Sequence, residues 1–159
     1  MNTKIYILIL SALFSSCLTF GQTTTTSPAT TTAKEHRKSI LSSHKKVKQK
    51  TAAIANDTVP LAKKRQYSKQ IGRELKNAHN KQDSLYATMS PSEKAEHKAN
   101  HEKIQSAHKK AIQQHKLLDQ ELSRPQPDSS KVKAYNDSLQ KTIDISNKEY
   151  EQEKYPEVF

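Results

Sequence analysis

Residues 89–93 read Met-Ser-Pro-Ser-Glu, and this stretch decides how the chain is divided into elements. The side-chain oxygen of Ser90 can accept from a backbone N–H at a helix start, and Glu93 can reach back to the N–H of Ser90. Pro91 takes the first helical position, where no backbone donor is needed. The stretch therefore predicts a helix that begins at Pro91.

Helical signals extend outward from this start over most of the chain. Apolar residues recur at three- and four-residue spacings, which predicts four helices, over about 34–55, 60–89, 91–123 and 129–154. Pro125 and Pro127 end the third helix, because neither can occupy a helix interior. Gly72 is the only glycine after position 21, so the chain lacks the usual turn residues of a β protein.

These elements predict an all-α fold. The connections between the expected helices are short, which favours antiparallel neighbours. We therefore expect an elongated antiparallel bundle of coiled-coil-like helices, with the basic first segment either docked on the other three or free. Leu, Ile, Val and Phe supply only 20 of the residues after position 21, so the core must be thin. The expected inward seam of the first helix is Ile40, His44, Val47, Thr51 and Ile54.

The N-terminal segment has the layout of a secretory leader. A short region with one positive charge, Asn2–Lys4, precedes ten apolar residues, Ile5–Phe14, and this run is short for a membrane span. We expect residues 1–21 to be a signal peptide, residues 22–33 a disordered Thr-rich linker and residues 155–159 an apolar tail. The protein is therefore expected to be exported, either to a periplasm or out of the cell.

A second interpretation of the leader involves Cys17, which is the only cysteine. Phe14-Ser15-Ser16-Cys17 resembles the lipobox of bacterial lipoproteins, in which the cysteine is lipidated and becomes the new N-terminus. Lipidation would anchor the protein in a membrane, and only then is a membrane an expected partner. In either case the mature body contains no disulfide and no thiolate metal site.

Positive charge is concentrated in the first half of the chain. The chain has a formal charge of +11; residues 34–81 contain 14 basic and 3 acidic residues, whereas residues 82–159 contain 12 and 13. Such asymmetry predicts an anionic partner. The candidate anion-binding residues are Lys45, Lys46, Lys48, Lys50, Lys63, Lys64 and Arg65. Tyr67 is the only Phe, Tyr or Trp in the basic half, which argues against sequence-specific nucleic-acid recognition.

Four histidines lie on one face of the predicted third helix. His97, His101, His108 and His115 are spaced by 4, 7 and 7 residues, which places them on the face that also carries the apolar residues. One interpretation is that they are neutral and half-buried between helices. The alternative is that His97 and His101, one turn apart, bind Zn²⁺ or Cu²⁺. A third is that protonation below about pH 6.5 loosens the bundle.

Recognisable catalytic motifs are absent from the sequence. The stretch from His97 to His101 lacks the glutamate of a metalloprotease motif, and a single glycine cannot build a phosphate-binding loop. We therefore expect no enzyme activity and no cofactor, with zinc or copper as the only candidate ligands of that kind. Residues 89–93 resemble the Leu-Thr-x-x-Gln signature of small periplasmic helical chaperones of the Spy type, and this resemblance implies a chaperone-like role.

The expected function is that of an exported helical protein of the cell envelope that acts by binding. Its expected partner is an anionic envelope polymer or another protein, and a second copy of the chain is a further candidate. The alternative expectation is a metal-binding protein that uses the histidine face.

The two interpretations of the leader predict different mature N-termini. Cleavage leaves an unacylated chain that begins at Gln22, which is the outcome we expect, whereas lipidation leaves an acylated Cys17. Mass spectrometry of the protein isolated from the producing cell distinguishes the two. An acylated N-terminal peptide would contradict cleavage before Gln22.

Overall fold

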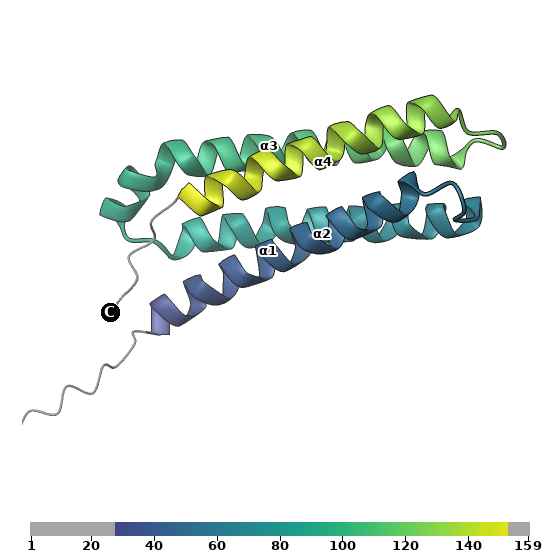
Figure 1. Ribbon diagram of the computed structural model, residues 1–159. Helices are drawn as coiled ribbons and strands as arrows, with labels where there is room; N and C mark the ends of the chain where they lie inside the picture. Colours follow the sequence, from purple (N-terminus) through teal and green to yellow (C-terminus); the bar gives the residue numbers. More distant parts are fainter. Residues whose placement is uncertain (1–27, 153–159) are drawn as a thin grey trace, which may run out of the picture.

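The computed structural model describes the backbone of residues 28–152 and the side chains of residues 33–152. Within this range the chain forms α-helices and no strand, which confirms the predicted all-α fold (Figure 1). The helices are α1 (Pro28–Ala55), α2 (Leu61–Thr88), α3 (Pro91–Ser123) and α4 (Ser129–Gln152). A helix as long as α3, with 33 residues, extends for about 50 Å, so the bundle is elongated.

The helices form an antiparallel bundle in which each packs against two neighbours. Helices α1 and α3 lie diagonally opposite each other, and both contact α2 and α4. The α1–α2 and α3–α4 connections lie at one end of the bundle, and the α2–α3 connection lies at the other (Figure 1). The basic first segment, expected to be either docked or free, is therefore docked between α2 and α4.

The bundle begins earlier in the chain than the sequence suggested. Helix α1 starts at Pro28, so residues 28–33, assigned from the sequence to the disordered linker, are helical. Proline fits a helix start because its missing N–H would have no partner there, and Ala33 packs against the core. Outside the described residues lie the expected signal peptide, the rest of the linker, and the end of the last helix with the tail: residues 1–21, 22–27 and 153–159.

Side-chain caps define where the last two helices begin. Ser90 Oγ accepts from Glu93 N at 3.3 Å and Glu93 Oε2 accepts from Ser90 N at 2.7 Å, which confirms the predicted capping box. The bonds from Ser90 stabilise the ionised carboxylate and lower the pKa of Glu93. For α4, Asp128 Oδ1 accepts from the backbone N–H groups of Ser130 at 2.9 Å and Lys131 at 3.3 Å.

The core consists of two apolar clusters. The larger cluster, nearer the α1–α2 connection, contains Val47, Ile54, Ile71, Leu75, Ala111, Leu118, Leu122, Val132, Leu139 and Ile143. The smaller cluster contains Ile40, Ala78, Leu85, Ile104 and Tyr150. Every helix contributes to both clusters, so every helix also crosses the level that separates them.

Polar side chains occupy that level. We call this set the polar layer; it consists of His44 from α1, His79 from α2, His108 from α3, and Ser146 and Asn147 from α4. His44, His108 and Ser146 are at most 1% exposed. The inward seam predicted for α1 is buried at all five positions, including His44, and is therefore confirmed.

Replacing Ser90 with alanine removes the side-chain acceptor at the start of α3. We expect Ser90→Ala to lower the free energy of unfolding by about 1 kcal/mol, measured by urea denaturation at pH 7. Ser92→Ala is the matched control, because Ser92 is exposed in the same turn and outside the capping box. Equal losses in the two variants would contradict a specific role for the cap.

Candidate functional site

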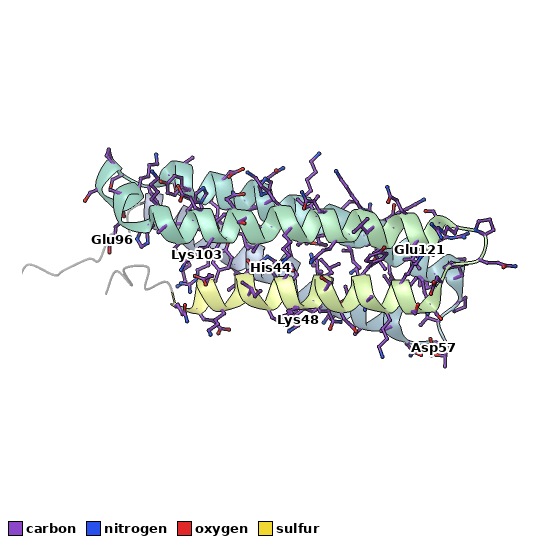
Figure 2. All side chains as sticks on the ribbon, turned by 90° about the horizontal axis from the view of Figure 1, so that it is seen from above. His44, Lys48, Asp57, Glu96, Lys103 and Glu121 are labelled. Atoms are coloured by element: carbon purple, nitrogen blue, oxygen red, sulfur yellow. The ribbon has the colours of Figure 1, made fainter. Side chains whose placement is uncertain are left out.

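The basic residues singled out from the sequence lie on α1 and α2, which are adjacent in the bundle (Figure 1). Lys45, Lys46 and Lys48 are exposed on α1. Lys46 Nζ lies 3.3 Å from Glu74 Oε1, and Lys48 Nζ lies 2.6 Å from Asp144 Oδ1. Lys48 therefore links α1 to α4 at the edge of the bundle (Figure 2), and these two lysines are partly neutralised.

Arg65 has a structural role that the sequence analysis missed. Its Nε donates to Leu122 O at 2.6 Å, and its Nη2 donates to Arg124 O at 2.8 Å. Carbonyl groups in the last turn of a helix lack helical partners, and the helix dipole favours a cation there. Arg65 thus caps the C-terminal end of α3, although it lies 57 residues before Leu122 in the chain. Local sequence patterns do not reveal such a contact.

The remaining predicted anion-binding residues form fewer contacts within the protein. Lys45, Lys50, Lys63 and Lys64 form no ion pair with any residue that the structure describes, and Lys63 Nζ lies 5.3 Å from the centre of the Tyr67 ring. Further exposed cations lie on the same two helices. We call the exposed set the basic face: Lys34, Lys38, Lys45, Lys46, Lys48, Lys63, Lys69, Arg73 and Lys76.

The two histidines proposed as metal ligands both lie on α3, and His101 faces α2. His97 is 8% exposed. His101 is half-buried; its Nδ1 lies 3.1 Å from Gln82 Nε2, and its ring stacks on Tyr86 with centroids 3.9 Å apart. Within residues 33–152, no group of three or more His, Cys, Asp or Glu side chains could hold a metal ion. Metal binding by His97 and His101 stays a prediction, in which these two histidines would be the protein ligands of the ion.

His115 lies where α2 and α3 approach closely. Its Nε2 donates to Ser68 O at 2.8 Å, and Ser68 Oγ donates to Asp119 Oδ1 at 2.6 Å. Gly72 faces this imidazole: a Cβ atom placed on Gly72 would lie 2.7 Å from His115 Cε1. The one glycine of the body therefore leaves the space that the histidine ring occupies.

The most buried histidines form a contact that the sequence analysis did not foresee. His44 Nε2 lies 2.9 Å from His108 Nε2, and the two rings meet edge to face inside the bundle, where Figure 2 labels His44. Burial lowers the pKa of His44. Burial also lowers the pKa of His108 to about 3, and the neighbouring His44, His79 and His101 add to that shift. The available sequence signal was the position of His44 within the buried seam.

A shallow depression lies on the surface between α2 and α3. Its volume is about 890 Å³ and it is wide open to solvent. Its lining consists mostly of charged and polar side chains, among them His79, Asp83, His101, Glu102, Lys109 and Lys110. Because the depression is open, water reaches the groups that line it.

Gly72 and His115 provide a test of the α2–α3 packing. In a His115→Ala background we expect Gly72→Ala to stabilise the protein by about 1 kcal/mol, because alanine is the better helix former. In the wild type we expect a smaller gain or a loss, since the new methyl group displaces the imidazole from Ser68. Urea denaturation of the four proteins in this double-mutant cycle measures the coupling. An identical gain in both backgrounds would mean that the two side chains do not interact.

Comparison with known proteins supplies no relative from which a function can be transferred. No family model, no curated protein and no solved structure matches the chain. None of the helices in residues 28–152 is sufficiently long and apolar to cross a membrane.

Proposed function

We propose that this protein acts without catalysis, by adhering through its basic face to an anionic polymer of the cell envelope. The observation that supports the proposal is the charge of one pair of adjacent helices. Residues 34–81, which cover most of α1 and α2, contain 14 basic and 3 acidic residues. The remainder of the chain is almost balanced, so the positive potential is concentrated on one side of the bundle.

The three acidic groups of residues 34–81, which are Glu35, Asp57 and Glu74, neutralise little of this charge. Glu74 pairs with Lys46 at 3.3 Å and also accepts from Ser43 Oγ at 2.9 Å. Asp57 lies in the α1–α2 connection, at the end of the bundle (Figure 2). Most cations of the basic face are therefore available to an external anion. Exposed charges attract a polyanion over about 10 Å at 0.1 M salt.

The chemistry of the basic face favours an extended polymer over a small ligand. Lysine predominates over arginine on the face, and its ammonium group is a mobile point charge without the fixed bidentate geometry of arginine. The exposed cations run along helices of 28 residues each, or about 42 Å. Tyr67 is the only Phe, Tyr or Trp between residues 34 and 81 and is half-buried, so stacking on nucleic-acid bases has little support. Phosphate- or carboxylate-bearing glycans are the partners that this surface suits best.

Export is part of the proposal, because the expected leader would deliver the protein to the envelope where such polymers occur. A chaperone-like role has less support. Among the five residues that resemble the Spy signature, Ser90 and Glu93 form the capping box of α3, and their side-chain bonds have a local structural purpose.

Neutralising part of the basic face should weaken binding to a polyanion. We expect the triple variant Lys45→Gln/Lys69→Gln/Lys76→Gln to bind fluorescently labelled heparin about tenfold more weakly than the wild type at low salt. Fluorescence anisotropy at several NaCl concentrations measures the affinity. We also expect a smaller dependence of the affinity on salt, because fewer counterions are exchanged.

The matched control removes three exposed lysines from the other two helices. The variant Lys116→Gln/Lys133→Gln/Lys141→Gln loses the same net charge but keeps the basic face, and its affinity should stay within about twofold of the wild type. Equal weakening in both triple variants would mean that binding depends on the net charge of the protein and not on the basic face. Binding that does not respond to salt would contradict the proposal outright.

A further inference from the structure

The contact between His44 and His108 joins the two helices that lie diagonally opposite each other in the bundle. The rings come from α1 and α3, which are diagonal in the bundle, and they meet with 2.9 Å between their Nε2 atoms. Both side chains are at most 1% exposed. Ser146 Oγ of α4 lies 3.2 Å from His108 Nε2. The contact is therefore enclosed at the level where the two apolar clusters are separated.

The hydrogen bonds of the pair assign its protons. His44 Nδ1 lies 2.7 Å from Asn147 Oδ1, and an amide oxygen can only accept, so His44 carries its proton on Nδ1. Its Nε2 is then the acceptor for the Nε2–H of His108. His108 Nδ1 is consequently unprotonated, and it has no hydrogen-bond partner among the described residues. Both rings are neutral in this arrangement.

The groups around the pair offer no negative charge to stabilise an added proton. From α2, the ring of His79 lies with its centroid 6.2 Å from that of His108. From α4, the ring of Tyr150 lies 6.0 Å from His44, and its hydroxyl donates to Gln82 Oε1. From α3, His101 is close enough to His108 to act on it electrostatically. The polar layer and its immediate neighbours are thus neutral or cationic groups.

Nearby carboxylates are engaged elsewhere. Asp83 Oδ2 lies 4.0 Å from His79 Nε2, and Asp83 Oδ1 accepts from Gln105. Asp144 pairs with Lys48. None of the carboxylates that the structure describes is hydrogen-bonded to His44 or His108. An imidazolium at this level would therefore be a buried charge without a counter-ion, which proteins rarely tolerate.

We propose that the His44–His108 contact is an acid-sensitive closure of the bundle, which holds near neutral pH and opens in mildly acidic solution. A first added proton goes to His108 Nδ1, where it meets no acceptor. A second would go to His44 Nε2, and two N–H groups would then face each other across 2.9 Å. The pair cannot carry both charges and keep its contact, so α1 and α3 must separate.

The sign of the effect follows from the depressed pKa values. In the unfolded chain both imidazoles titrate near pH 6.5. In the bundle, burial lowers the pKa of His44, and that of His108 falls to about 3. Between about pH 6.5 and 3 the unfolded chain therefore binds protons that the bundle excludes, and stability is lost as the pH falls through this window. Glu93 and Asp128 also have lowered pKa values, and these carboxylates affect the stability mainly at the lower end of this pH window.

The test compares the folding equilibrium constant of the full chain at pH 7.5 and pH 5.5 by urea denaturation. Exclusion of a proton from His108 lowers this constant about tenfold between these two values, and the lowered pKa of His44 adds to that decrease. In His44→Leu/His108→Leu, which replaces the pair by apolar groups, we expect this contribution of the pair to disappear. The matched control is His115→Gln, since His115 is half-buried outside the polar layer, and it should keep the wild-type response.

A single substitution keeps the test informative if the double variant does not fold. His108→Gln retains an amide donor for His44 but has no titrating ring, so we expect its response to be about tenfold smaller than that of the wild type. Imidazole chemical shifts of the wild type, followed by NMR, report directly on protonation. Titration of His44 and His108 near pH 6.5 in an intact bundle would overturn the proposal. So would a full acid response in the double variant.

Discussion

Burial of polar side chains at one level of the core constrains the rest of this structure. A buried donor or acceptor that loses its partner costs about 1–3 kcal/mol, so His44 must find His108 and Asn147 at the observed height. Sliding α1, α3 or α4 by one turn would separate these partners. The polar layer therefore fixes the register of α1, α3 and α4, whereas two uniform apolar seams would tolerate several registers.

The scarcity of aliphatic residues gives the polar layer this importance. Two small clusters on either side of it, one of ten residues and one of five, contain most of the buried apolar side chains. Contacts outside the clusters supplement them: Arg65 closes the end of α3, and Lys48 joins α1 to α4. In such a bundle the apolar core contributes little stability, and the buried polar contacts determine how the helices align. The same polar groups make the stability of the bundle depend on pH.

Local sequence signals predicted the ends of a helix correctly where neighbouring residues determine those ends. The capping box at Ser90 and the prolines after Ser123 place the ends of α3 at the residues observed, because both act through the backbone within a few positions. Helix α1 starts six residues before the predicted position, because the Thr-rich composition of residues 22–33 indicates disorder and Pro28 falls within that stretch. Packing of residues such as Ala33 on the core is not visible in composition.

The sequence by itself determined the helices, the inward seam of α1 and the one-sided charge, because periodicity, caps and composition are properties of neighbouring residues. It also placed four histidines on one face of α3. Only the tertiary structure decided which of them is buried against another ring, since His44 lies 64 residues away from His108. The same holds for Arg65, whose partners are carbonyl groups of a distant helix end. Side chains that meet across a bundle are selected by the packing of whole helices, and no local pattern records that choice.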